Sequence, residues 1–463
     1  MKTGLVKEYI LYPFTKMKGA VFTLLTGTAS SQLILILAAP LLTRIYDPTA
    51  FGHYAYTTLM LSIFVVFSTG KYELGILLQD DDHSAGQIAS LAILCSLFTT
   101  IIAAVLGAFY VAIDTSLPAT LGLEKSEIIQ ILILSTLLIP LNAIQSVLLI
   151  WMNRKGTYRG ISYTRFTQAV VMVCTQIFFS NITGGVLGLI IGTAFALILS
   201  IIVQLTFITE KNKILSPNKN QLIFMAKKHS NLPKHLISTD MISTLLSQAP
   251  VYFLGAYYSS AVVGYFSLAQ RTLQAPMQMI SSSIGEIFRR EASTTYLKNN
   301  ECRSYFLKTA GILTCIAVPV LILVATSAEE IFATIFGASW KTAGSFASIL
   351  IIMFSIRFIA SPLSFMFTLT TNTKLDLLLH SLFLIVLTLI FWGAENHLHS
   401  PEMALWLFSI AYSLFYLGYF LLSYQFSKGK SGSDLKLYSA KTLSNTAIQN
   451  TITTNEELTK KNI

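Results

Sequence analysis

The sequence predicts an all-helical, polytopic membrane protein with twelve transmembrane helices in two halves of six. Composition, the apolar runs and the placement of the basic residues lead to this prediction. Of the 463 residues, 53% are hydrophobic and only 12% are charged. Because a soluble domain carries about 25% charged residues, this chain cannot cover a water-facing surface of its size. The composition excludes a cytosolic enzyme, a secreted disulfide scaffold and a nucleic-acid-binding domain.

Apolar runs set the positions of the predicted helices, since about 20 apolar residues cross a bilayer as a helix. The sequence contains twelve such runs, and only residues 181–183 separate the fifth from the sixth. The helices are expected near 20–42, 51–70, 86–113, 127–151, 161–180, 184–208, 236–258, 261–285, 304–326, 344–370, 375–394 and 401–424.

The basic residues choose between the two possible orientations of these helices. The loops that share a side with both termini hold 27 of the 32 Lys and Arg residues, with Arg165 counted among them. The opposite loops hold only Arg44, Lys125 and Lys341. Basic residues concentrate in cytoplasmic loops, so both termini are predicted to be cytoplasmic. The net charge of +10 is therefore a topology signal rather than a nucleic-acid footprint.

Composition shifts divide the chain into four parts. Six-helix bundles are expected at 1–208 and 236–424, joined by a basic cytoplasmic linker at 209–235, and the polar tail at 425–463 is expected to be disordered. A weak repeat supports the two halves. Phe51-Gly52-His53-Tyr54 in the first half matches Val263-Gly264-Tyr265-Phe266 in the second. Two copies in the same orientation are typical of transporters.

Two arginines are the strongest candidate substrate-binding residues. Arg271 lies about ten residues and Arg357 about thirteen residues into their expected helices, near mid-membrane. A cation there costs about 3 kcal/mol and usually marks a substrate path. The guanidinium fork matches phosphate oxygens, so the pair indicates a phosphate or pyrophosphate. The alternative is a structural pairing with helix-end carbonyls or with an acid such as Asp240.

Uncharged polar residues are the next candidates for contacts to substrate. They are either a cavity lining for sugar hydroxyls or interhelical hydrogen-bonding groups. The candidates are Gln32, Asn142, Gln145 and Gln248. Asp240 and Glu73 are candidate ion-coupling acids, with salt bridges to Lys71 or nearby arginines as the alternative. No catalytic residue, metal site or cofactor is expected.

An amphipathic pattern precedes the tenth expected helix. Five apolar residues fall on one helical face, and this pattern indicates a separate helix lying along the periplasmic membrane surface. These residues are Ile331, Phe332, Ile335, Phe336 and Trp340.

Four motifs in order resemble those of a known family over roughly residues 10–425. They are Arg44-Ile45-Tyr46-Asp47-Pro48 with Phe51-Gly52-His53-Tyr54; Lys71-Tyr72-Glu73-Leu74-Gly75-Ile76; Val263-Gly264-Tyr265-Phe266 with Ala269-Gln270-Arg271; and Phe336-Gly337-Ala338-Ser339-Trp340-Lys341-Thr342-Ala343. They look like the signatures of bacterial polysaccharide and O-antigen flippases. These form the oligosaccharide flippase branch of the multidrug/oligosaccharidyl-lipid/polysaccharide exporter superfamily. Lys71 stands where an arginine is usual, and Arg289-Arg290 stand where a proline often follows the eighth helix.

The resemblance implies two six-helix bundles forming a V around a central cavity. It implies alternating-access transport of undecaprenyl-diphosphate-linked oligosaccharide to the periplasmic leaflet of the bacterial inner membrane, for O-antigen, capsule or exopolysaccharide synthesis. The expected partners are this lipid-linked substrate, membrane lipids, and the polysaccharide polymerase and chain-length machinery. Coupling to a proton or sodium gradient is also expected.

Two other functions remain open at this point. A cation-coupled multidrug exporter of the same superfamily would favour an acidic, aromatic cavity. A polysaccharide polymerase or ligase would carry a large periplasmic loop, whereas the largest one expected here, near 327–343, is short.

Overall fold

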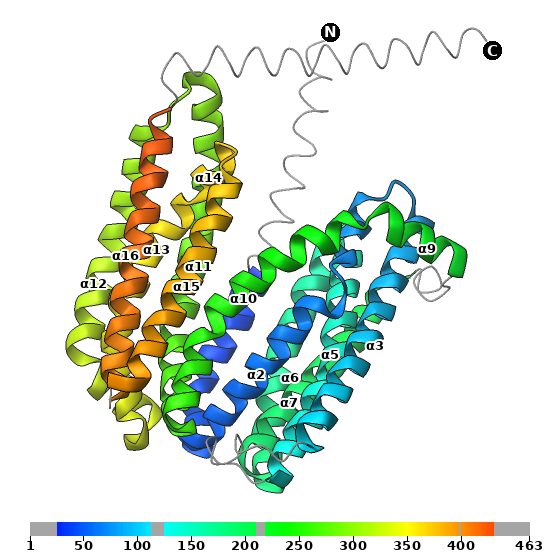
Figure 1. Ribbon diagram of the computed structural model, residues 1–463, viewed down its shortest axis with the longest axis horizontal. Coiled ribbons are helices and arrows are strands. Elements are labelled where there is room, and N and C mark those ends of the chain that lie inside the picture. Colours follow the sequence, from blue (N-terminus) through cyan, green and yellow to red (C-terminus); the bar gives the residue numbers. More distant parts are fainter. Residues whose placement is uncertain (1–25, 113–124, 210–217, 398–399, 430–463) are drawn as a thin grey trace. The chain divides into compact units, whose positions relative to one another are not determined.

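A computed structural model describes residues 26–112, 125–209, 218–397 and 400–429. Every regular element in these ranges is a helix (Figure 1). In chain order they are the helix Thr26–Ile45, α2 (Pro48–Ser68), η1 (Tyr72–Leu78), α3 (Asp82–Ala112), α5 (Lys125–Arg154), α6 (Tyr158–Thr183), α7 (Gly185–Phe207), α9 (Lys219–Lys228), α10 (Asn231–Tyr257), α11 (Ser260–Asn299), α12 (Arg303–Phe336), η2 (Ala338–Trp340), α13 (Lys341–Leu363), α14 (Phe365–Leu369), α15 (Thr373–His397) and α16 (Pro401–Ser427). The tail from residue 430 lies outside the described residues.

Each of the twelve predicted spans coincides with one long helix or, for the tenth, with α13 and α14 together. Ten helical segments are long and apolar enough to cross a membrane within the described ranges. The two predicted spans without such a segment are α10 and α11, which have 27 and 40 residues but are more polar. At about 1.5 Å per residue, α11 is about 60 Å long, twice the thickness of the hydrocarbon layer. Part of α11 therefore extends beyond the layer.

Two expectations about local structure were wrong. The expected surface helix near residues 331–340 is not separate, because α12 continues without a break to Phe336. Its apolar stripe is the end of that helix, and Phe332 and Phe336 are buried. Arg165, counted as a loop residue, lies in the second turn of α6. The region expected to be a linker contains the ten-residue helix α9.

The described chain divides into two compact units. Unit 1 comprises the residues up to 279 together with 321–354 and 377–411, and unit 2 comprises 280–320, 355–376 and the residues from 412 onward. In unit 1, α2, α3, α5, α6 and α7 pack side by side (Figure 1). The core of unit 2 is built on Phe288, Phe306 and Met366. The division into bundles at 1–208 and 236–424 stays a prediction.

In unit 1, each glycine of the sequence repeat lies against the backbone at the start of the helix that carries the other glycine. A side chain at Gly52 of α2 would overlap the Ser260 carbonyl oxygen, and one at Gly264 of α11 would overlap the Pro48 carbonyl oxygen. Only glycine allows such an approach of two backbones. We call this contact the Gly52–Gly264 crossing, and it explains why both copies of the repeat carry glycine at the same position.

Trp340 completes this region of unit 1. Its side chain is fully buried, and its indole Nε1–H donates to the Thr43 carbonyl oxygen at 2.9 Å. Its ring lies edge-on to Phe51 and Tyr265, with centroid separations of 5.1 and 5.9 Å. Three of the four motifs quoted from the sequence therefore meet at one place, and each contributes to the packing of the others.

Candidate functional site

Arg357 of α13 is a predicted substrate-binding arginine and lies in unit 2. Its side chain is half-buried, and the guanidinium carbon lies 6.0 Å from the centre of the Tyr416 ring. Tyr412 stacks obliquely on Tyr416, with 5.1 Å between the ring centroids. No ion pair of Arg357 exists among the described residues. A cation–π contact holds the charge without using the N–H donors, so those donors can bind an anion.

Helix α16 supplies the tyrosines of this site from one face. Tyr412, Tyr416 and Tyr419 are spaced by four and three residues, which places them on the same side of a helix. Tyr419 donates a hydrogen bond to Asp376 at the start of α15, and its ring stacks on Phe367 with 4.3 Å between centroids. These tyrosines were not among the predicted site residues, although their helical spacing is visible in the sequence.

Arg271 of α11, in unit 1, is exposed. Within the residues that the structure describes, no hydrogen bond or ion pair is made by its side chain. Because Arg271 and Arg357 belong to different compact units, their sharing of one anion stays a prediction.

The amides predicted in the first half differ in their surroundings. Gln145 of α5 donates through Nε2 to Gln168 Oε1 of α6 at 2.6 Å. The backbone carbonyl oxygen of Gln145 accepts from Nε2 of the buried Gln204 of α7 at 3.3 Å. Asn142 donates to Leu138 of its own helix at 2.9 Å. Both side chains thus make hydrogen bonds inside the bundle, and contacts to substrate by either stay a prediction.

Two further predicted amides have no such bonds in the described part of the chain. Gln32 lies on the helix Thr26–Ile45 and Gln248 on α10, and both side chains are half-buried. Neither makes a hydrogen bond to another described residue. Their donors and acceptors are therefore unused within the described ranges.

Arg165 of α6 is another arginine within a predicted transmembrane helix. It is half-buried and donates to the Thr28 hydroxyl across to the helix Thr26–Ile45. Gly27 allows the two helices to approach closely here, since a side chain at this position would overlap Ser162. Gln168, one turn further along α6, continues this polar face. Arg165 already fell inside the helix expected at 161–180, and that position was the signal for its role.

The two candidate coupling acids are in different environments in unit 1. Asp240 of α10 forms an ion pair with Lys71 at 2.6 Å. Lys71 has a left-handed backbone, with φ of 60°. Glu73 of η1 is 7% exposed, and its Oε2 has no hydrogen-bond partner among the described residues. Coupling by either acid stays a prediction.

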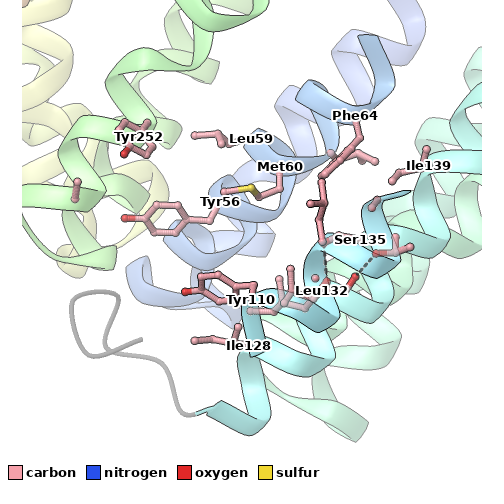
Figure 2. Close-up of a pocket in the computed structure, with 17 residues that line it drawn as sticks. Tyr56, Leu59, Met60, Phe64, Tyr110, Ile128, Leu132, Ser135, Ile139 and Tyr252 are labelled. Atoms are coloured by element: carbon pink, nitrogen blue, oxygen red, sulfur yellow. Dashed lines mark hydrogen bonds between the residues drawn. The ribbon is translucent and has the colours of Figure 1, made fainter. Parts of the chain in front are cut away.

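An apolar pocket of about 430 Å³ lies in unit 1 between α2, α3, α5 and α10 (Figure 2). We call it the inner pocket. Its volume is within the usual range for small-molecule sites, about 300–1,000 Å³. Aliphatic side chains make up most of its lining, and they include Leu59, Leu106, Ile131 and Leu132. The hydroxyl groups of Tyr56, Tyr110 and Tyr252 lie on the α10 side of the pocket (Figure 2).

Comparison with known proteins adds a family and a fold. Residues 41–345 match a family described as polysaccharide biosynthesis protein. This match spans the Gly52–Gly264 crossing and Trp340. No curated protein matches the chain.

Solved structures with the same fold are transporters. A lipid II flippase, MurJ, in an inward closed conformation has a TM-score of 0.70 at 12% identity, covering 86% of this chain and 87% of that one. An inward-facing multidrug resistance MATE family transporter of the MOP superfamily has a TM-score of 0.55 at 14% identity, with coverages of 87% and 93%. A MOP superfamily transporter from Pyrococcus furiosus has a TM-score of 0.52 at 14% identity, with coverages of 87% and 94%.

These similarities confirm the predicted fold class. The fold has twelve transmembrane helices in two bundles and is all-helical. The V-shaped arrangement of the bundles around a central cavity stays a prediction for this chain. The fold resembles that of solved transporters, and the family match is to a polysaccharide biosynthesis protein.

Proposed function

We propose that this chain, which belongs to the polysaccharide biosynthesis protein family, is a flippase for undecaprenyl-diphosphate-linked oligosaccharides in the bacterial inner membrane. The observation that carries the proposal is Arg357, an arginine held by tyrosine rings with its donors unused among the described residues. A cation kept inside a membrane fold without a carboxylate partner favours an anionic ligand.

The substrate has three parts, and the chain offers each of them a matching surface. The diphosphate would bind the guanidinium fork of Arg357, with Arg271 as the second predicted cation. The glycan would meet polar side chains such as Gln32 and Gln248, whose hydrogen-bonding groups are unused in the described part of the chain. The hydrocarbon tail would stay in apolar surroundings. Rocking of one bundle against the other would provide alternating access.

The orientation follows from the basic residues. With 27 of 32 Lys and Arg on the side of both termini, we place both termini in the cytoplasm. A reporter fused after Lys430 should then behave as cytoplasmic and one inserted near Ser116 as periplasmic. The opposite behaviour at either position would contradict this orientation.

Transport would be driven by a proton gradient or a sodium gradient. Glu73 is the preferred carrier of a coupling proton, because it is buried and its Oε2 is unpartnered among the described residues. Asp240 is instead held by Lys71. Replacing Glu73 by Gln should remove the dependence of transport on a proton gradient. If Glu73→Gln leaves that dependence unchanged, Glu73 is not the coupling residue.

The flipped oligosaccharide would pass to a polysaccharide polymerase and its chain-length machinery, and we propose that the chain associates with them. The family match supports a place in polysaccharide synthesis. Co-purification from crosslinked membranes should recover these proteins. Recovery no better than that of an unrelated inner-membrane transporter would argue against the association.

A multidrug exporter is the second candidate, because the fold is also that of a MATE family transporter. Such a protein would bind organic cations, and Arg357 and Arg271 would repel them. The two functions therefore differ in the sign of the charge that the substrate carries. A polymerase or ligase remains the third alternative, and the proposal requires no covalent step.

The deciding experiment compares two cargoes in proteoliposomes that contain the purified protein. A fluorescent undecaprenyl-diphosphate-linked oligosaccharide should change leaflets, and a cationic dye should not be transported. Arg357→Ala should abolish the movement of the lipid-linked oligosaccharide, and Arg159→Ala is its matched control, because Arg159 is an exposed arginine of α6. Transport of the dye without movement of the lipid-linked oligosaccharide would contradict the flippase proposal and favour the exporter.

A further inference from the structure

We propose that the inner pocket binds the hydrocarbon tail of the lipid-linked substrate, and that the tail enters from the bilayer between α3 and α5 at Gly107. This inference rests on the proposed flippase function and names the part of the substrate that the inner pocket would hold. The pocket belongs entirely to unit 1.

The lining of the inner pocket suits a hydrocarbon and little else. Among the described residues, no charged side chain lines it. The hydroxyl groups of Ser135 and Thr136 donate to carbonyl oxygens one turn earlier in α5, at 2.6 and 2.7 Å. A sugar or phosphate would lose its hydrogen bonds to water here without replacing them, whereas burial of apolar groups is favourable by about 25 cal/mol per Å².

A second apolar pocket lies against the first. This outer pocket has a volume of about 440 Å³ and shares Gly107, Leu132 and Thr136 with the inner pocket. Its lining includes Ile133 and Leu137, which are 57% and 56% exposed. In a chain that spans a membrane, exposed aliphatic side chains on two apolar spans face lipid. The outer pocket therefore opens toward the bilayer.

Helix geometry shows why Gly107 stands between the two pockets. Ala103, Leu106 and Tyr110 line the inner pocket, and their spacing of three and four residues puts them on one face of α3. Ala104 and Ala108 line the outer pocket from the neighbouring face. Gly107 falls on the boundary between these faces, as Leu132 and Thr136 do on α5.

The wall between the pockets is thin at this point. A Cβ atom on Gly107 would lie 4.0 Å from the Leu132 side chain, an ordinary loose contact. Gly107 of α3 therefore faces only Leu132 and Thr136 of α5 across the boundary between the two pockets. Rotation of Leu132 to another staggered rotamer would join the inner and outer pockets without any movement of the backbone.

Tyrosine hydroxyls are the polar groups on the α10 side of the inner pocket. The Tyr56 and Tyr110 hydroxyls lie on the side of α10 (Figure 2), and the Tyr56 hydroxyl is buried with no partner among the described residues. A ligand whose hydrocarbon tail passes from the bilayer into the protein needs a lateral opening of this kind. The lipid-linked substrate is such a ligand.

The test is photocrosslinking in proteoliposomes with radiolabelled undecaprenyl diphosphate as the probe. A photoreactive amino acid replaces either Ile131 in the inner pocket or Leu323, an exposed residue of α12. We expect labelling from position 131 to be about tenfold stronger, which corresponds to roughly 1.4 kcal/mol of preferential binding. Equal labelling from both positions, or equal competition by an ordinary phospholipid, would show that bilayer lipid fills the pocket and would overturn the inference.

Two substitutions at the wall test the route of entry. Gly107→Phe should reduce labelling at position 131 about tenfold by filling the opening. Gly311→Phe is the matched control, because a side chain at Gly311 would meet no neighbour among the described residues. Leu132→Ala should instead increase labelling, so the route remains testable if Gly107→Phe fails to fold. Unchanged labelling in Leu132→Ala would overturn the proposed entry at Gly107.

The outcome for the tail site is separable from that for the flippase function. If the wild-type protein flips lipid-linked oligosaccharide but position 131 is not labelled, the tail-site inference alone is wrong. If the wild-type protein moves no lipid-linked oligosaccharide, the proposed function fails, and specific labelling at position 131 loses its interpretation as substrate binding.

Discussion

The Gly52–Gly264 crossing and the Arg357 site satisfy their polar groups in opposite ways. At the crossing, backbones touch and Trp340 uses its only donor on the Thr43 carbonyl. The Trp340 ring therefore has no further donor for a ligand. At Arg357, tyrosine rings hold the cation, while its N–H donors have no hydrogen-bond partner among the described residues.

This difference separates positions that maintain the fold from positions that act on a substrate. Closely packed backbones leave no space for a ligand, so changes there reduce the stability of the protein. A charged group with unused donors gains from binding an anion. Substitutions at the two regions should therefore have different consequences, and the predictions below test this contrast from the largest expected effect to the smallest.

The largest expected effect is that of Gly264→Val at the crossing. The new side chain would overlap the Pro48 carbonyl oxygen, and backbone cannot move aside cheaply. We expect a loss of stability of about 3 kcal/mol, visible as a lower thermal midpoint in detergent and as reduced accumulation. Gly311→Val should cost little, because a side chain at Gly311 meets no described neighbour. Equal effects of the two variants would contradict the role assigned to the crossing.

Trp340→Phe should have the next largest effect. The substitution removes the Nε1–H donor, leaves the Thr43 carbonyl without this bond and creates a small cavity. We expect a loss of about 2 kcal/mol in stability. Trp406→Phe is the control, since Trp406 is 43% exposed. A Trp340→Phe variant as stable as that control would show that the buried hydrogen bond contributes little.

Lys71 allows a backbone effect to be separated from a charge effect. Both Lys71→Ala and Lys71→Gly remove the ion pair to Asp240, which contributes little because Asp240 is 48% exposed. Only glycine is comfortable at φ of 60°. We expect Lys71→Gly to be more stable than Lys71→Ala by about 1 kcal/mol. Identical thermal midpoints of the two variants would contradict the argument from backbone strain.

The smallest effect is a pH dependence at His229. Burial, followed by the charge of Lys228, lowers the pKa of His229 below its ordinary 6.5. The Gln79 amide Nε2 lies 3.1 Å from the His229 Nε2, and since an amide nitrogen only donates, that ring nitrogen must be unprotonated. The folded state then binds fewer protons than the unfolded state, so stability rises with pH in this range.

This contribution is present above pH 6.5 and is lost as the pH falls from 6.5 through the lowered pKa of His229. The thermal midpoint of the wild-type protein should fall between pH 7.5 and about pH 5 more than that of His229→Asn. Parallel changes in both proteins would show that other groups determine the pH dependence.

The sequence predicted helices well and connections poorly, for a physical reason. A run of about 20 apolar residues has few alternatives to a membrane-spanning helix, so all twelve positions coincide with long helices. Whether a helix stops or continues depends on tertiary packing. The stripe from Ile331 to Phe336 gave the same periodicity for the end of α12 as for a separate surface helix.

The candidate site could be predicted only in part. Arg357 stood out because a charge inside an apolar run is rare. Arg165 was missed because its position near the start of α6 led to its being counted as a topology signal. The inner pocket could not be foreseen, since it depends on how α3 and α5 pack at Gly107. A pocket is lined by side chains from several helices, so it cannot be predicted from any single segment of the sequence.

The most direct test of the central claim is the affinity of the purified protein for two lipids that differ only in their head groups. Undecaprenyl diphosphate carries the anion, and undecaprenol lacks it. We expect Arg357→Ala to weaken binding of the diphosphate about 100-fold, or roughly 2.7 kcal/mol, while binding of undecaprenol and the thermal midpoint stay nearly unchanged. Arg357→Lys should recover only part of the loss, because an ammonium group lacks the planar fork. Unchanged diphosphate affinity in a folded Arg357→Ala protein would contradict the account.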